Sequence, residues 1–134
     1  MKLLMLNIFA PAILALMLVL PASPALAQIA QCSEKRNVQA KALDEVTWKQ
    51  LNGVYEDVGE EKFDSAYEDL QKMLKRSGRN EYLQAIIYQA LAQVEWSRKN
   101  YDASLSHFEK AVALDALPDQ QHFALMYQIA QLYF

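Results

Sequence analysis

The side chains that could do chemistry in this sequence are few and scattered. Its two histidines, His107 and His122, lie outside any His-Glu-x-x-His pattern, and neither has another histidine one helical turn away. Ser104 and Ser106 have no neighbouring base that could activate a hydroxyl group. We expect His107 to meet solvent. The sequence therefore predicts no catalytic residue and no enzyme activity.

One acidic run has the composition of a cation site but not its spacing. Glu56, Asp57, Glu60, Glu61 and Asp64 lack the regularly spaced oxygens and central glycine of a calcium loop. A solvated loop explains them better, because acids are favourable at the start of the helix that follows. Only three glycines are present, and they form no phosphate-binding loop. No metal and no cofactor are expected.

The length and charge of the chain limit its class and its partners. With 134 residues it is long enough for one small domain, and its formal net charge is −3. Lysine and arginine do not cluster as they would on a nucleic-acid-binding surface. We therefore expect no nucleic-acid partner.

Residues 1–27 have the layout of a secretory signal peptide. Lys2 precedes an apolar run over residues 3–20, and Ala25-Leu26-Ala27 resembles a cleavage site. Cleavage before Gln28 would give an exported chain with no further membrane contact. The apolar run is also long enough for an uncleaved anchor, which stays the alternative.

The segment after the signal peptide, residues 28–42, is a polar lead-in without an apolar period. It contains Cys32, the only cysteine, so these residues form no internal disulfide bond. The thiol could pair with another chain or carry a lipid. Gln31 is larger than the small residue that a lipidation signal places before its cysteine.

Apolar residues recur three or four apart over residues 43–134, which predicts helices and an all-α fold. The expected helices are 43–58, 61–75, 81–98, 99–115 and 118–134, with Asn80 as the N-cap of the third. Gly59 is expected to take a left-handed conformation after the first helix. The residues expected to face the core are Val46, Leu51, Val54 and Tyr55, then Phe63, Ala66, Tyr67, Leu70, Met73 and Leu74, then Ala85, Tyr88, Leu91 and Ala92, then Tyr101, Leu105, Phe108, Ala111, Val112 and Leu114, and lastly Phe123, Met126, Ile129, Ala130 and Tyr133.

An internal repeat joins these helices into pairs. Phe63 matches Tyr101, Leu70 matches Phe108, and the three residues from Ala92 match those from Ala130, always 38 residues apart. A constant offset over both helices of a unit predicts repeated helical hairpins. The hairpins expected are about 43–76 and 81–115, followed by a half hairpin over 118–134.

These hairpins resemble the tetratricopeptide repeat (TPR) family. Trp48-x-x-Leu51-x-x-x-Tyr55 is similar to its first-helix signature, with Tyr88, Leu91 and Ala92 at the corresponding positions of the next unit, and Tyr101, Ser104, Phe108, Ala111 and Pro118 resemble its second half. Glu95 departs from the pattern, which has an aromatic residue there. The resemblance implies stacked antiparallel hairpins in a TPR-like solenoid, truncated at its C-terminal end.

The resemblance also implies a concave groove that binds a peptide or a helix of a partner protein. The groove positions of the family fall on Lys49, Glu56, Gln89, Gln93, Trp96, Tyr127 and Gln131. The alternative is that the glutamines only solvate the surface and that Trp96 packs under a neighbouring helix.

The residues Met126 to Tyr133, together with the exported start, resemble exported bacterial TPR proteins that accompany the TonB energy-transduction system. That likeness implies a periplasmic, non-catalytic scaffold. The rival expectation is an architectural subunit that self-associates through its repeat surfaces.

Overall fold

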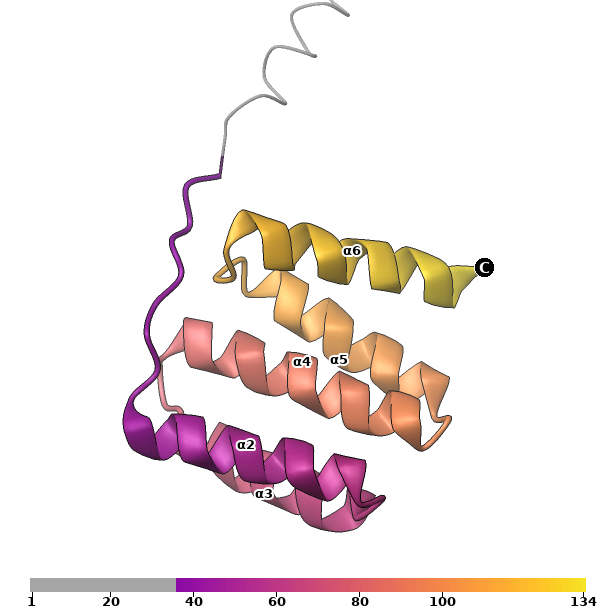
Figure 1. Cartoon of the computed structure of the whole chain (residues 1–134). Coiled ribbons are helices and arrows are strands. Elements are labelled where there is room, and N and C mark those ends of the chain that lie inside the picture. Colours follow the sequence, from indigo (N-terminus) through magenta and orange to yellow (C-terminus); the bar gives the residue numbers. More distant parts are fainter. Residues whose placement is uncertain (1–35) are drawn as a thin grey trace, which may run out of the picture. The chain divides into compact units, whose positions relative to one another are not determined.

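The computed structural model describes residues 36–134. This part of the chain contains five α-helices and no strand: α2 Glu45–Gly59, α3 Phe63–Arg76, α4 Glu81–Ser97, α5 Tyr101–Ala113 and α6 Asp119–Tyr133. Each helix packs against the one before it, and Figure 1 shows the chain turning back on itself after each helix. The all-α prediction is confirmed for these residues, and the helix limits lie within two residues of those expected.

Side-chain caps fix where two of the helices begin. The Asp44 carboxylate accepts a hydrogen bond from the Thr47 backbone N–H at 3.0 Å and starts α2. Asn80 Oδ1 accepts one from the Leu83 N–H at 3.1 Å and starts α4, so the predicted Asn80 cap is confirmed. Each cap satisfies an amide that the first helical turn leaves free.

The turns within the two hairpins have the same backbone structure. Glu61, between α2 and α3, has φ 61°, and Lys99, between α4 and α5, has φ 63°. Gly59 was expected to be the left-handed residue, but it is the last residue of α2, and the reversal occurs two residues later. Each turn also has a hydrogen bond from a backbone N–H to the carbonyl five residues earlier, from Lys62 to Asp57 at 2.8 Å and from Asn100 to Glu95 at 2.9 Å. The 38-residue repeat therefore extends to the hydrogen bonds of the turns.

Helix α4 has apolar residues buried on two faces, as expected for a helix inside a small domain. One face joins a cluster with α2 and α3 that includes Leu51, Leu70 and Leu91. The other joins a cluster with α5 and α6 that includes Ala92, Phe108 and Leu125. Complete burial of a leucine such as Leu70 or Leu91 stabilises the fold by about 1.5 to 3 kcal/mol.

Small residues set the close approach of α4 and α5. Ala92 and Ser104 are both fully buried, and the Ser104 hydroxyl donates a hydrogen bond to the Ala92 carbonyl at 2.8 Å. A longer side chain at either position would push the helices apart.

Helix α2 buries a narrower face than expected. Leu51 and Val54 are buried as expected, but Val46 is 65% exposed and Tyr55 46%. Val46 and Tyr55 lie at the two margins of the face that apolar spacing predicts, and Leu51 and Val54 lie between them.

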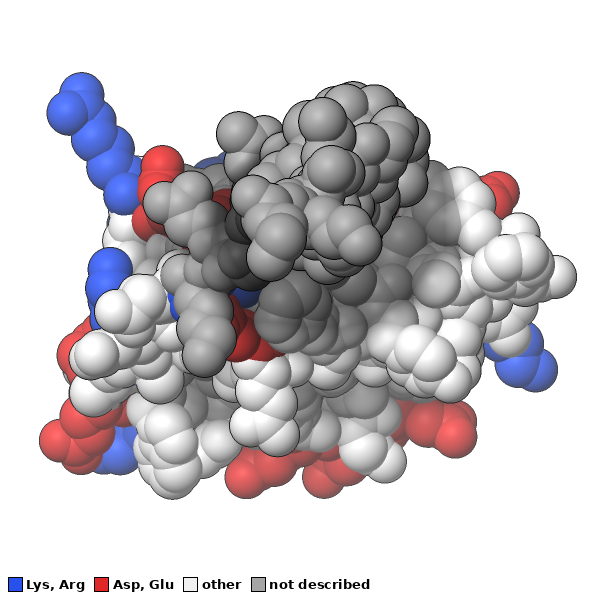
Figure 2. All heavy atoms as spheres, turned by 90° about the horizontal axis from the view of Figure 1, so that it is seen from above, with Lys and Arg blue, Asp and Glu red and all other residues white. Residues whose placement is uncertain are grey.

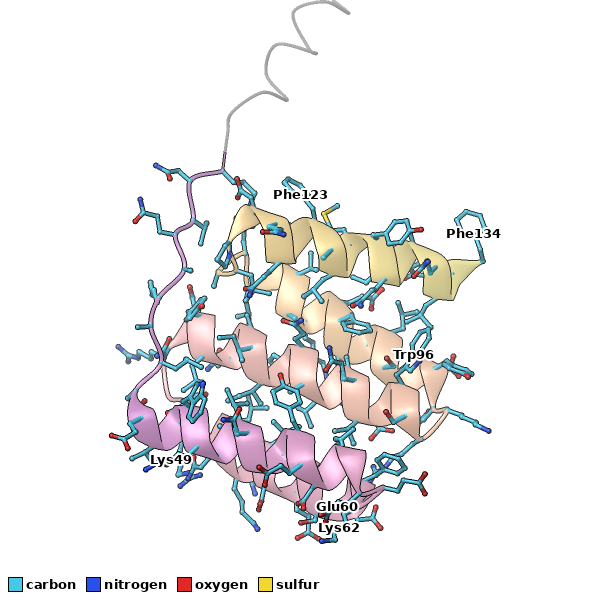
Figure 3. All side chains as sticks on the ribbon, in the orientation of Figure 1. Lys49, Glu60, Lys62, Trp96, Phe123 and Phe134 are labelled. Carbon is cyan, nitrogen blue, oxygen red and sulfur yellow. The ribbon has the colours of Figure 1, made fainter. Side chains whose placement is uncertain are left out.

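The 38-residue register also shows that the outer edge of α2 is polar. Lys49 and Glu56 are exposed, whereas the residues 38 positions later, Ile87 and Val94, are fully buried between α4 and the first hairpin. Figure 3 shows Lys49 on the side of α2 away from α4. The exposed edge of the first hairpin thus has charged groups where the second hairpin has core residues.

Two valines of α2 test the width of this buried face with one and the same substitution. Val54→Ala is expected to lower the free energy of unfolding by about 2 kcal/mol, because it removes buried methyl groups and leaves a cavity. Val46→Ala should change it by less than about 0.5 kcal/mol, because the side chain is in water. Urea denaturation of both variants measures the difference. Equal losses would contradict the difference in burial between Val54 and Val46.

Helix α6 buries one side only. Leu125 and His122 are buried against the rest of the domain, while Phe123 is 55% exposed and Met126 46%. Ala130 and Tyr133 were also expected in the core and are exposed, because no helix in residues 36–134 covers that side. Figure 3 shows Phe123 and Phe134 on the outside of α6, and the described residues visible in Figure 2 are mostly uncharged, with charges at the rim.

Tyr101, also expected in the core, is 49% exposed. Its ring lies edge-on to that of Trp96, with the ring centroids 5.3 Å apart. Phe63, its counterpart in the first hairpin, is partly buried against the α2–α3–α4 cluster. The two aromatic residues that begin α3 and α5 thus differ in burial.

The end of the polar lead-in is attached to the second hairpin. Arg36 donates hydrogen bonds to the Leu117 carbonyl at 3.0 Å and to Asp119 at 3.2 Å, and it forms an ion pair with Asp115 at 2.7 Å. A charged side chain thus ties residue 36 to the turn between α5 and α6. No sequence pattern predicted this contact.

The expected signal peptide and Cys32 lie outside the described residues. Within residues 36–134, none of the helices combines the length and the apolar character needed to span a bilayer.

Candidate functional site

A pocket of about 310 Å³ is lined by residues of α2, α4, α5 and α6, and we call it the groove pocket. It lies near the C-terminal end of α4, where Figure 3 labels Trp96. Its lining is Val58 from α2, Gln93, Trp96 and Ser97 from α4, Phe108 from α5, and Gln128 and Gln131 from α6. None of these side chains carries a charge.

Three of the seven residues expected to line a groove meet in this pocket. Gln93 and Gln131 occupy the same position in successive units, and Trp96 lies one helical turn beyond Gln93. Trp96 is 46% exposed, so it is not packed under a neighbouring helix. Its edge contact with Tyr101 holds the indole at the pocket wall.

The other four expected residues lie elsewhere. Lys49 forms a surface ion pair with Glu45 at 2.7 Å, and Glu56 lines a different pocket between α2 and α3. Tyr127 is 66% exposed, and Gln89 is partly buried; neither lines the groove pocket. At the 38-residue offset the counterparts of Lys49 and Glu56 are the buried residues Ile87 and Val94, whereas the counterpart of Gln93 is Tyr55.

Sequence reasoning missed Val58, Ser97, Phe108 and Gln128 as pocket residues. Val58 could have been found, since it stands 38 residues before Trp96 and the offset applies to α2 as well. Phe108 was assigned to the core and is indeed buried, but it also forms part of the pocket wall. The repeat does not point to Gln128, because the residue 38 positions earlier is Ala90, which is buried.

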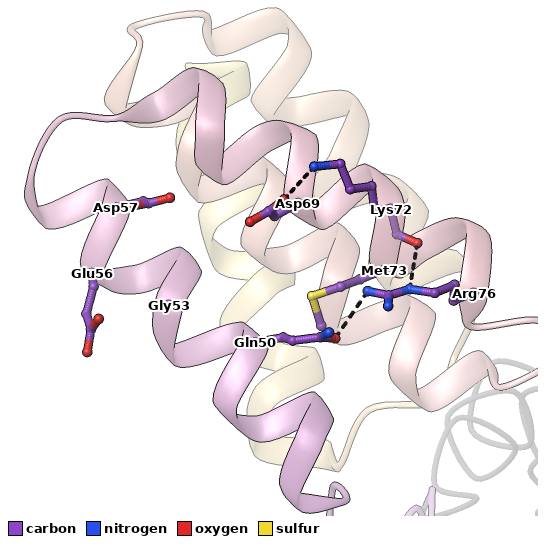
Figure 4. Close-up of a pocket in the computed structure, with 8 residues that line it drawn as sticks. All are labelled: Gln50, Gly53, Glu56, Asp57, Asp69, Lys72, Met73 and Arg76. Carbon is purple, nitrogen blue, oxygen red and sulfur yellow. Dashed lines mark hydrogen bonds and ion pairs between the residues drawn. The ribbon is translucent and has the colours of Figure 1, made fainter.

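A second pocket, of about 460 Å³, separates α2 from α3 and is rich in charge (Figure 4). Arg76 donates hydrogen bonds to Gln50 Oε1 and to the Lys72 carbonyl, each at 3.3 Å, and Lys72 pairs with Asp69 at 2.8 Å. Its cations are thus engaged by neighbouring groups, and surface pairs of this kind stabilise a protein little. We find no ligand-specific arrangement in this pocket.

The side chains considered above as candidates for chemistry are not arranged for it. The Ser104 hydroxyl is buried and donates to the Ala92 carbonyl, so it is not presented as a nucleophile. The acidic run forms no metal-binding group, and no cluster of three or more metal-ligating side chains occurs in residues 36–134.

His107 is half-buried, so the expectation of a solvated histidine is wrong. Its ring lies between those of Tyr67 and Tyr88, at centroid distances of 6.4 and 6.1 Å. Burial lowers its pKa, and Lys110 lowers it further against the opposing effect of Glu95. Burial also lowers the pKa of His122, with Arg36 acting in the same direction.

These lowered pKa values predict that the domain loses stability in mild acid. An unfolded histidine takes up its proton near pH 6.5, whereas the folded state resists it until lower pH. The unfolded state therefore binds more protons below about pH 6.5, and the free energy of unfolding should fall as the pH drops from 7.5 to 5.

Urea titrations of the wild type and of a His107→Gln, His122→Gln double variant at both pH values measure this loss. The double variant should lose part of the pH dependence. An unchanged dependence would assign it to other groups.

Comparison with family models, curated proteins and solved structures finds no match for this chain, so its site is interpreted from its own geometry.

Proposed function

We propose that this chain is a TPR-like stack of helical hairpins that binds an extended peptide or helix of a partner protein across α2, α4 and α6. The observation that carries the proposal is the convergence of Gln93, Trp96 and Gln131 on one uncharged pocket. Carboxamides donate and accept hydrogen bonds and so suit a peptide backbone, and the exposed indole adds apolar area with one polar atom. No catalytic group is needed for this role.

The same proposal places the protein outside the cytoplasm. Residues 1–27 support export, and the likeness to exported TPR proteins supports a periplasmic scaffold that accompanies a TonB-type system. Mass spectrometry of the amino terminus tests the first step. A mature chain beginning at Gln28 is expected, and an intact Met1 would contradict cleavage.

Selection from a random dodecapeptide library tests the binding function. Peptides selected by the chain should bind the Gln93→Ala, Trp96→Ala double variant at least tenfold more weakly, because both substitutions remove groove contacts. Gln121→Ala is the matched control, since Gln121 is exposed on α6 and does not line the pocket. Equal binding by all three proteins would refute the groove as the site.

Self-assembly is the second candidate, and one observation favours it. Phe123, Met126 and Tyr133 form part of an exposed apolar side of α6, and such surfaces commonly mark interfaces. Light scattering over a range of concentrations tests it. A chain that stays monomeric, and an Ala130→Glu variant that behaves identically, would eliminate this candidate.

A further inference from the structure

The turn between α5 and α6 lacks a backbone hydrogen bond that the turns within the two hairpins have. In each hairpin turn the left-handed residue, Glu61 or Lys99, donates its N–H to the carbonyl three residues earlier, and the next residue donates to the carbonyl five residues before it. Asp115 is also left-handed, with φ 48°, and donates to the Val112 carbonyl at 3.0 Å. The second hydrogen bond, from the Ala116 N–H, does not occur among the described residues. This turn thus has less hydrogen bonding of its own, although a left-handed aspartate is less favourable than a left-handed glycine.

Arg36 contacts both sides of this turn. Its Nη2 atom donates to the carbonyls of Asp115 at 3.2 Å and Leu117 at 3.0 Å, and it pairs with the Asp115 carboxylate at 2.7 Å. Its Nη1 atom donates at 3.2 Å to the carboxylate of Asp119, the first residue of α6. A guanidinium has several donors in one fixed plane and can bridge such a set of acceptors, whereas an ammonium group has a single donor atom.

The segment that carries Arg36 is also attached at its other end. Residues 36–44, which we call the strap, form no helix and end at Asp44, the N-cap of α2. Leu43 packs against both core clusters, while residues 39–42 are exposed. Figure 1 shows the strap running from the level of α6 to the start of α2. It therefore joins the two helices that lie at opposite ends of the array.

We infer that the strap is a conformational clasp and that Arg36 is a positioning residue for α6. Its guanidinium takes the place of the missing turn hydrogen bond, holds Asp115 in its left-handed conformation and so fixes where α6 begins. Helix α6 buries one side only, so its position depends on this contact. The inference concerns how the chain positions α6 and does not depend on peptide binding.

Hydrogen exchange of the full chain, measured by mass spectrometry, tests the inference. Arg36→Met removes the guanidinium and keeps an unbranched side chain. The amides of residues 114–133 should then exchange at least about fivefold faster, because opening of α6 no longer breaks charge-assisted hydrogen bonds. The amides of α2 and α3 should change by less than about twofold. Lys41→Met is the matched control, since Lys41 is an exposed residue of the strap, and it should leave α6 unchanged.

Glycine at position 115 separates positioning of the turn from general stabilisation. In the Arg36→Met background, Asp115→Gly should restore slow exchange in α6, because glycine adopts the left-handed conformation without strain and makes the guanidinium unnecessary. Lys99→Gly relieves the same conformation, φ 63°, in a turn that Arg36 does not contact. It should not slow the exchange of α6.

The pKa of His122 provides an independent readout of the clasp. His122 Nδ1 lies 3.7 Å from the Asp115 carboxylate, and burial lowers its pKa, with Arg36 acting in the same direction and Asp115 and Asp119 opposing. Loss of the neighbouring cation favours the protonated ring. An NMR titration should therefore show a higher His122 pKa in Arg36→Met than in the wild type or in Lys41→Met.

Three outcomes would overturn the inference: equal exchange of α6 in Arg36→Met and Lys41→Met, faster exchange in all five helices to the same extent, or an unchanged His122 pKa. Circular dichroism shows whether each variant folds. If Arg36→Met is unfolded, Arg36→Lys takes its place. It keeps the cation but not the planar set of donors, and it should give a smaller increase in exchange confined to the same residues.

Discussion

Arg98→Ala is expected to lower the free energy of unfolding by about 3 to 5 kcal/mol, because it strands a buried carboxylate. Glu95 is only 4% exposed, and its two oxygens accept hydrogen bonds from Arg98 Nη1 and Asn100 Nδ2, each at 3.0 Å. Arg98 also pairs with Asp64 and lies 5.1 Å from the centre of the Tyr67 ring. One guanidinium therefore joins the α4–α5 turn to α3.

A double variant that also neutralises Glu95 provides the control for this loss of stability. Glu95→Gln combined with Arg98→Ala should be less destabilised than Arg98→Ala alone, because an amide costs less to bury than an unpaired carboxylate. Urea denaturation at pH 7.5 measures all three proteins. A loss below about 1 kcal/mol for Arg98→Ala would show that water reaches Glu95 and that the pair behaves as a surface ion pair.

Leu70→Ala is expected to cost about 2 to 5 kcal/mol of stability, the range for deleting a fully buried leucine side chain. Leu70 lies in α3 with no exposed surface, in the cluster shared with α2 and α4. Leu70→Met nearly conserves volume and should cost less than about 1.5 kcal/mol. Thermal and urea denaturation measure both variants, and similar losses would indicate a loosely packed cluster.

The sequence was sufficient to predict the helices but not how wide a face each one buries. Apolar spacing located all five, because a face that must be buried leaves a period that can be counted. The error in α2 came from assigning every regularly spaced apolar residue to the core, although Val46 and Tyr55 lie at the margins of the face that Leu51 and Val54 bury.

Burial on α6 could not be predicted from periodicity, since a period shows which residues share a face and not whether another helix covers it. Phe123 and Met126 were placed in the core for this reason, and they are exposed. Glu95 shows the reverse case, a charged residue in the interior, because Arg98 and Asn100 supply its hydrogen bonds from the following turn. Such partners are recognised only when the turn geometry is known.

The candidate site was predictable where the repeat was regular. Gln93 and Gln131 follow from the offset, and the structure brings them to one pocket. Gln128 does not, because its counterpart at the same offset, Ala90, is a buried alanine.

The outer edge of α2 is charged and the outer side of α6 is apolar, so the two ends of the array of helices differ. Packing another helix pair against α2 would desolvate Lys49 and Glu56, whereas packing one against α6 would cover Phe123 and Met126. Identical chains stacked head to tail would have to join a charged edge to an apolar one at every junction, which disfavours an open filament. Addition of a helix pair against α6 therefore covers apolar side chains, whereas addition against the outer edge of α2 also desolvates charged ones.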